Sequence, residues 1–284
     1  MAPTALKFFL DTTGQESAEN ETRFFRSLKV RNRNSKQTQL GRLDALNETA
    51  VELLTGPERR ISAVLDVGIS SGVTTVELFE SLNCAGLTPA IVATDLSIYA
   101  SIVHLSQNVR VLVDSAGDVL QYDIFGLAIR PWRRRLDSFT GMALVKSFIE
   151  HLYSERARKA AVEGGERRDR VALINPRLAA NKSIEVCEDD LLLRNPAFAK
   201  RFDFIRAANV LNREYFDEAT LARAIDTLKS YLSGPGAIIL IVRTNDQTGH
   251  HGAFYELLSD NRLGVLHIVG DGSELASLID AASL

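Results

Sequence analysis

The stretch VLDVGISSGVTTVEL, residues 64–78, constrains the fold more than any other part of this chain. An apolar run of strand length ends at a glycine turn, and a helical pattern follows over residues 73–82. Further apolar runs lie at residues 90–94, 184–187, 202–207, 237–242, 254–257 and 263–269. Helical patterns such as residues 218–232 separate several of them. Strands that alternate with helices form a mainly parallel sheet that is covered on both faces, so we predict an α/β fold.

Two segments do not fit this alternation. Residues 1–60 have helical patterns with polar breaks, which predicts an N-terminal helical cap. Between the second and third strands, residues 109–113 and 119–124 flank the turn DSAGD and predict a β-hairpin, and residues 141–162 predict a helix. We therefore predict a core formed by residues 61–108 and 171–284, interrupted by an insertion at residues 109–170 that acts as a lid or a dimer surface.

The glycine turn follows the pattern DxGxxxG, with Asp66, Gly68 and Gly72. A turn that holds a pyrophosphate has the spacing GxGxxG, whose middle glycine lets the backbone approach the phosphates. Ser70 stands at that position, and the sequence contains no GxxxxGK[ST] motif. These departures disfavour a phosphate-binding turn, and with it an NAD(P)-dependent oxidoreductase or epimerase.

Acidic residues follow two of the other predicted strands. A carboxylate at Asp95 is placed to accept hydrogen bonds from both hydroxyls of a ribose. Asp190 is placed to accept one from an adenine amino group, and Asp66 to anchor an ammonium group. Each acid alone has a simpler explanation: Asp95 as a helix cap, and Asp190 as a solvated turn residue. Three acids at strand ends together predict a site for an uncharged nucleoside with a charged amino-acid tail.

The segments VLDVGISSG, IVATDLS, EDDLL and FDFIRAANVLNREYF, taken together and in this order, resemble the class I S-adenosylmethionine-dependent methyltransferases. The resemblance covers roughly residues 40–269, interrupted by the insertion. It implies a Rossmann-like, mainly parallel seven-stranded sheet with helices on both faces, and S-adenosyl-L-homocysteine as the product of the cofactor. The residues it assigns to S-adenosyl-L-methionine are Asp66, Gly68, Ser70, Gly72, Asp95, Leu96, Asp190, Leu191 and Asn209.

Methyl transfer from a sulfonium needs alignment and exclusion of water more than a catalytic base. The fourth strand ends in RAANVLN and lacks the [DN]PP[FYW] motif of methyltransferases that act on bases or glutamine, so we expect an oxygen or nitrogen acceptor on a small or lipid-like molecule. Candidates for catalysis or positioning are Asn209, His250 and His251, the two histidines within an apparent loop. Asn212 and Tyr215 are candidates for the acceptor pocket. Helix capping and surface exposure are the alternative explanations for these residues.

The insertion carries IRPWRRRLD, residues 129–137, around the only tryptophan. Trp132 and Arg133 are therefore candidates for contact with a phosphate-bearing acceptor or an anionic lipid surface. The alternative is an ordinary solvated charged face. The apolar helix at residues 141–162 also raises the expectation of a homodimer.

Composition limits the remaining possibilities. A net charge of −3 argues against general nucleic-acid binding. The two cysteines form no CxxC or Cys/His cluster, so no structural zinc or disulfide is expected. The apolar run near the start is too short for a signal peptide, and no run approaches the length of a membrane span, which leads us to expect a cytoplasmic protein. Nothing in the sequence excludes a non-catalytic, methyltransferase-like protein that binds the cofactor or a partner.

Overall fold

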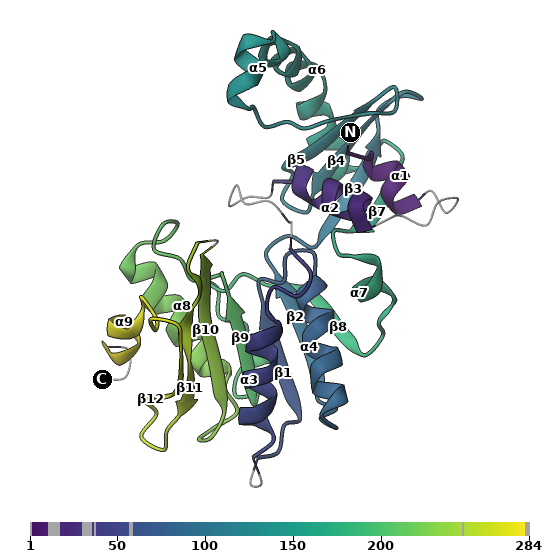
Figure 1. The fold of residues 1–284 in the computed structure, drawn as a ribbon. Helices are drawn as coiled ribbons and strands as arrows, with labels where there is room; N and C mark the ends of the chain where they lie inside the picture. The colour runs from purple at the N-terminus through teal and green to yellow at the C-terminus, as the bar shows by residue number, and fades with distance from the viewer. Residues whose placement is uncertain are drawn as a thin grey trace. The chain divides into compact units, whose positions relative to one another are not determined.

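The computed structural model describes residues 2–10, 18–29, 36, 38–56, 59–245 and 247–281. The chain divides into two compact units (Figure 1). Unit 1 contains residues 1–38 and 97–175, and unit 2 contains residues 39–96 and 176–284. Each unit has its own sheet and its own apolar core.

Unit 2 is built on a seven-stranded sheet in the order β12-β11-β10-β9-β1-β2-β8. Strands β8, β2, β1, β9 and β10 are mutually parallel, whereas β11 and β12 are antiparallel additions beyond β10. The strands are β1 (Ala63–Val67), β2 (Ala90–Asp95), β8 (Ile184–Glu188), β9 (Phe204–Ala208), β10 (Ile238–Asn245), β11 (Gly249–Leu257) and β12 (Leu263–Val269). The helices are α3 (Asp44–Leu54), α4 (Val73–Cys84), α7 (Pro176–Ala180), α8 (Glu218–Tyr231) and α9 (Ala276–Ala281), with the 3-10 turn η1 (Pro196–Phe198).

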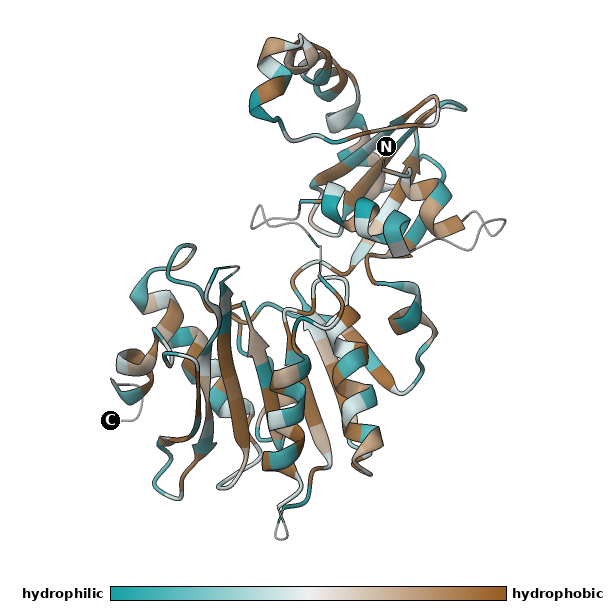
Figure 2. Cartoon of the chain, viewed as in Figure 1, coloured by the Kyte–Doolittle hydropathy of each residue, from teal (hydrophilic) through white to brown (hydrophobic). Residues whose placement is uncertain are grey.

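Helices cover both faces of this sheet because successive strand residues point to opposite sides. On β1, Leu65 and Val67 join the apolar core that α8 and α9 complete. Asp66, between them, lies on the other face, where it meets Thr75 of α4. Figure 2 shows the corresponding apolar colouring along β1, β2, β9 and β10. The predicted fold class, a mainly parallel seven-stranded α/β sheet with an inserted subdomain, is confirmed.

Unit 1 is a five-stranded antiparallel sheet in the order β6-β5-β4-β3-β7. Phe8, Phe24 and Phe25 of the N-terminal helices pack on one face of it, and Ile149 and Ala157 of α6 pack in a second cluster with other residues of its strands. The strands are β3 (Tyr99–His104), β4 (Val109–Asp114), β5 (Val119–Ile124), β6 (Leu127–Ile129) and β7 (Arg168–Ala172). The helices are α1 (Ala5–Leu10), α2 (Ala18–Ser27), α5 (Arg135–Phe139) and α6 (Met142–Glu163).

Unit 1 differs in extent from the predicted insertion. The hairpin β4–β5 and the helix α6 lie where the sequence predicts them. The sheet also includes β3 and β7, and the part of unit 1 that interrupts unit 2 comprises residues 97–175, which contain the predicted insertion at residues 109–170. The helices α1 and α2 belong to it as well, whereas α3 of the predicted N-terminal cap belongs to unit 2. The sequence analysis did not predict strand β7, because its sequence RDRVA has no apolar run. An edge strand tolerates such charged residues.

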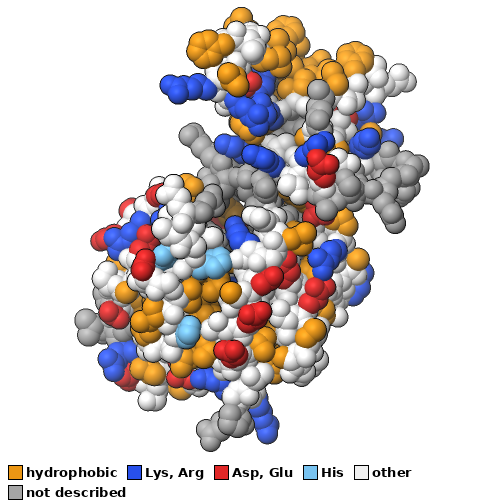
Figure 3. All heavy atoms as spheres, viewed as in Figure 1, with side chains coloured by type: hydrophobic (Ala, Val, Ile, Leu, Met, Phe, Trp, Pro, Cys, Tyr) orange, Lys and Arg blue, Asp and Glu red, His pale blue; other side chains and the backbone are white. Residues whose placement is uncertain are grey.

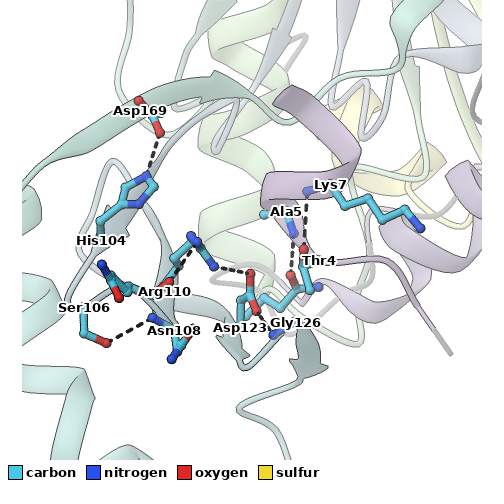
Figure 4. Close-up of polar contacts among 12 residues, drawn as sticks. Thr4, Ala5, Lys7, His104, Ser106, Asn108, Arg110, Asp123, Gly126 and Asp169 are labelled. Carbon is cyan, nitrogen blue, oxygen red and sulfur yellow. Dashed lines mark hydrogen bonds and ion pairs between the residues drawn. The ribbon is translucent and has the colours of Figure 1, made fainter. Parts of the chain in front are cut away.

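Polar contacts tie one end of the unit 1 sheet together (Figure 4). His104 Nε2 lies 2.6 Å from Asp169 Oδ2, which links β3 to β7. Asp123 accepts a hydrogen bond from the backbone N–H of Gly126 and pairs with Arg110 on the neighbouring strand. His104 thus has a structural partner within its own sheet.

Candidate functional site

The candidate site lies where the parallel strands of unit 2 reach their carboxyl ends. Strand β1 leads into the glycine turn, β2 ends at Asp95, β8 is followed by Asp189 and Asp190, and β9 is followed by Asn209. Because β8, β2, β1 and β9 are neighbours and parallel, these segments meet at one edge of the sheet. Open α/β sheets bind their ligands at this edge.

The turn after β1 has an unusual backbone. Gly68, Ser70 and Gly72 have φ angles of 69°, 58° and 80°, in the left-handed region that side chains disfavour. A Cβ atom on Gly68 would lie 2.4 Å from Cγ2 of Val210, so packing as well as conformation demands glycine there. The backbone N–H of Gly68 donates to Thr94 O at 2.7 Å and fixes the turn to β2.

Asp95 joins the turn to the neighbouring strand end. Its Oδ2 accepts a hydrogen bond of 2.7 Å from the backbone N–H of Ser70, and its carbonyl oxygen accepts one of 3.1 Å from the N–H of Asp189. A carboxylate offers about four acceptor positions, so it can accept several hydrogen bonds at once.

Two half-buried acids follow β8. Asp189 Oδ1 accepts a hydrogen bond from Asn195 Nδ2 at 3.0 Å, and Asp190 Oδ1 accepts one from the N–H of Leu192 at 3.0 Å. Burial raises the pKa of Asp189 above its usual value against the effect of Asn195, and the charge of Asp190 adds to the rise. Leu191 packs against the core beneath this segment, whereas Leu96, after Asp95, is exposed.

Asp66 lies within the sheet rather than at its edge. Its carboxylate, 3% exposed as a residue, accepts hydrogen bonds from Arg206 Nε at 2.8 Å and Nη2 at 2.6 Å. Thr75 Oγ1 donates a third, at 2.7 Å. Arg206 is also buried, and its Nη1 donates to Asn47 of α3 at 2.9 Å. Neutralising Arg206 accounts for a buried acid at this position without a ligand.

A chain of side chains connects the ends of β9, β10 and β11. Asn209 has a φ of 61°, which asparagine tolerates better than most residues. Its Oδ1 accepts from the N–H of Thr244 at 2.6 Å, and its Nδ2 donates to Thr244 Oγ1 at 3.1 Å. Thr244 Oγ1 in turn lies 3.0 Å from His250 Nδ1. The sequence analysis did not identify Thr244, because a threonine near a strand end carries no distinctive pattern.

The two histidines lie in β11 and not in a loop, which corrects the prediction. The polar sequence around them is typical of a loop. In the structure, however, Thr244 pairs with His250 and Arg243 with His251 in the antiparallel ladder between β10 and β11. His251 Nδ1 accepts from the N–H of Asp271, and its Nε2 lies 2.8 Å from Thr248 Oγ1. These contacts give His251 a structural role in the hairpin.

The remaining candidates are distributed between the units. Asn212 is buried, and its Oδ1 accepts from the N–H of Glu214 in a tight turn, while Tyr215 is 51% exposed. Trp132 and Arg133 belong to unit 1, where Trp132 Nε1 donates to Ser27 O and Arg133 bonds Ser147. Among the residues that the structure describes, no group of His, Cys, Asp and Glu is arranged to hold a metal ion. None of the described helices combines the length and apolarity needed to cross a membrane.

Comparisons with known proteins give only distant similarities. No family model and no curated protein matches the chain. Among solved structures, the N-methyltransferase NodS from Bradyrhizobium japonicum WM9, in complex with S-adenosyl-L-homocysteine, is 15% identical with a TM-score of 0.36, over 79% of this chain and 74% of NodS. The CurJ carbon methyltransferase is 13% identical with a TM-score of 0.36, over 71% of this chain and 34% of CurJ. The [4+2]-cyclase SpnF is 13% identical with a TM-score of 0.35, over 84% of this chain and 56% of SpnF. The chain thus spans about a third of CurJ and just over half of SpnF.

Proposed function

We propose that unit 2 binds S-adenosyl-L-methionine at the carboxyl edge of its sheet and acts as a methyltransferase. The observation that carries the proposal is the position of Asp95, whose carboxylate lies on the glycine turn and whose backbone holds the end of β8. A nucleoside suits this arrangement because its ribose hydroxyls donate to carboxylates. The DxGxxxG spacing, with Ser70 at the position of the middle glycine, disfavours a pyrophosphate.

Each segment has a role in this proposal. Asp95 accepts hydrogen bonds from the ribose hydroxyls, with Leu96 beside it, and Asp190 accepts one from the adenine amino group, next to Leu191. The amino-acid tail of the cofactor lies along the turn from Gly68 to Gly72. When bound, the sulfonium supplies an activated methyl group, so the chain needs only to align an acceptor and keep out water.

The acceptor would meet the Asn209–Thr244–His250 chain. Thr244 holds the amide of Asn209 at both ends, which fixes its orientation, and Thr244 Oγ1 also contacts Nδ1 of His250. We assign His250 a positioning role toward an oxygen or nitrogen acceptor of a small or lipid-like molecule. Asn212 and Tyr215 follow on the next turn of chain as candidates for the pocket wall.

A second candidate function is cofactor binding without turnover. One observation favours it: Thr244 engages both ends of the Asn209 amide. In this alternative unit 2 senses the cofactor or assembles with a partner. Both candidates require the same binding site, so binding is tested first and methyl transfer second.

Calorimetric titration with S-adenosyl-L-homocysteine, S-adenosyl-L-methionine and NADPH tests the proposal. We expect binding of the first two and none of the third. Asp95→Ala should weaken binding of S-adenosyl-L-homocysteine by about 1.5–3 kcal/mol, roughly 10- to 150-fold, because hydrogen bonds to a charged acceptor are lost. Asp226→Ala, which removes an exposed acid of α8, is the matched control and should bind as the unmodified chain does. Binding of NADPH alone, or full affinity in Asp95→Ala, would refute the assignment.

A further inference from the structure

The end of unit 1 formed by α5 and the first half of α6 exposes large apolar side chains. Phe139, Leu144, Leu136 and Phe148 are 84%, 78%, 70% and 64% exposed. We call the following residues the α5–α6 tip: Leu136, Phe139, Met142, Leu144, Val145, Phe148 and Leu152. Figure 3 shows these orange side chains gathered at the end of the unit, with blue side chains next to them.

Helix α6 divides its apolar residues between two faces. Ile149, Ala157 and Ala160 belong to the core cluster formed with the strands of unit 1. Leu144, Phe148 and Leu152 recur every four residues and form a separate stripe on the exposed side. The stripe is therefore not needed to hold the helix on its sheet. Contiguous exposed apolar surface of this kind marks an interaction site.

Basic side chains surround the α5–α6 tip. Arg133, Arg134 and Arg135 are exposed and immediately precede Leu136. The acid within this segment, Asp137, is buried and lies 2.5 Å from the ammonium group of the buried Lys146, which neutralises it. The three arginines thus give the tip a positive rim, although the whole chain has a net charge of −3.

Trp132 fixes the rim to the body of unit 1. Lys29, Arg130 and Arg134 lie over its indole ring, with the charged groups 4.5 Å, 4.6 Å and 5.2 Å from the ring centre. Its Nε1 donates to the carbonyl oxygen of Ser27 on α2. Arg133 and Arg135 are absent from this stack and remain exposed to a partner.

The positive charge of the arginine rim distinguishes between two partners that could cover the α5–α6 tip, a second copy of the chain and a lipid surface. A second copy of the chain, docked tip to tip, would bring two arginine rims together, and like charges facing one another disfavour that contact. An anionic lipid surface satisfies both features, because apolar side chains enter the acyl boundary while arginines meet the phosphates. We propose that the α5–α6 tip attaches unit 1 to an anionic membrane surface, with Phe139, Leu144 and Phe148 inserted and Arg133 and Arg135 on the headgroups. This inference is independent of the function proposed for unit 2.

Co-sedimentation of the full chain with lipid vesicles tests the proposal. Binding should be strong to phosphatidylcholine vesicles that contain phosphatidylserine, weaker to pure phosphatidylcholine, and reduced by salt. The triple variant Phe139→Ser, Leu144→Ser, Phe148→Ser should bind at least about tenfold more weakly, because it removes the inserted apolar area. Its matched control, Leu193→Ser, Val265→Ser, Ile268→Ser, removes exposed apolar side chains of unit 2 and should bind normally.

The charge contribution is measured separately. Arg133→Gln with Arg135→Gln should weaken binding to the anionic vesicles by about 25-fold, since each arginine near such a surface contributes about fivefold. Lys182→Gln with Arg223→Gln removes two exposed cations from unit 2 and serves as the control. Equal binding to neutral and anionic vesicles would overturn the proposal. So would a vesicle-free dimer, seen in sedimentation equilibrium, that the triple serine variant abolishes.

Discussion

At the amino edge of the unit 2 sheet, the carboxylate of Asp203 accepts hydrogen bonds from the N–H and Oγ of Ser62, the N–H of Ala63 and Oγ of Ser233. At the carboxyl edge, the side chain of Asp189 accepts one hydrogen bond from the described residues, from Asn195. Burial alone would raise the pKa of both acids. At Asp203 the hydrogen bonds outweigh burial and hold the pKa below its usual value, whereas at Asp189 burial prevails.

The difference separates two uses of an acid. Asp203 joins the starts of β1 and β9 to the end of α8, and the donors around it stabilise its charge, as expected of an acid that serves the fold. Asp189 is half-buried beside Asp190 and has one side-chain donor, Asn195, so burial destabilises its charge and raises its pKa. Shifts of this second kind concentrate at binding and catalytic sites. The comparison gives a criterion for each acid that the sequence assigned to the cofactor.

Asp66 is the test of that criterion with the largest expected effect. If it serves the fold, Arg206→Met should lower the free energy of unfolding of unit 2 by about 3–5 kcal/mol, because it leaves a buried carboxylate unpaired. Urea denaturation, monitored by hydrogen exchange of the backbone amides of β1 and β9, measures the loss. The only tryptophan, Trp132, lies in unit 1, so its fluorescence provides an internal reference that should not change.

The double variant Asp66→Leu with Arg206→Met is the matched control, because it also removes the carboxylate that Arg206→Met leaves buried and unpaired. It should recover most of the lost stability, since neither partner is then left buried and charged. If Arg206→Met instead keeps its stability and loses affinity for S-adenosyl-L-homocysteine, Asp66 belongs with the acids of the carboxyl edge.

Asp203→Ala should lower the free energy of unfolding by about 2 kcal/mol at pH 7, since it leaves backbone and hydroxyl donors without their acceptor. The pKa of Asp203 is lower in the folded state, so its contribution is complete above the unfolded value of about 3.9 and is lost as the pH falls through the folded value. The difference from the unmodified chain should therefore shrink in acid. Urea titrations at several pH values measure it, and a difference of constant size would contradict this account.

The parallel strands and the glycine turn were predictable because their signals are local. Strand β1 is the apolar run that the sequence analysis places before the glycine turn, and β2, β8 and β9 lie within two residues of their predictions. Each is a short apolar run that a turn or a helical pattern bounds. The turn was recognisable because left-handed backbone and close packing leave glycine as the suitable residue at Gly68.

Features that depend on pairing between distant strands were not predictable in the same way. Asp66 and Arg206 are each the charged residue of an otherwise apolar strand, which is a signal that they pair. Only the order and register of the sheet place them opposite one another. Likewise, β11 begins among polar residues, and its identity as a strand comes from its ladder with β10. The covering of unit 1 by α1 and α2 joins segments far apart in the chain.

Asp189→Asn gives the smallest expected effect and the opposite sign. The neutral amide avoids the cost of a buried charge, so the free energy of unfolding should rise by about 0.5 kcal/mol at pH 7. Because the pKa of Asp189 is raised in the folded state, the protonated acid contributes fully below about 3.9 and loses that contribution as the pH rises through the folded value. The gain should therefore be absent at low pH and appear on going to neutral pH. Both variants, Asp189→Asn and Asp203→Ala, then differ most from the unmodified chain at neutral pH, with opposite signs. Thermal unfolding of both variants over the same pH series measures the contrast, and a loss of stability in Asp189→Asn at pH 7 would place this acid with Asp203 among those that serve the fold.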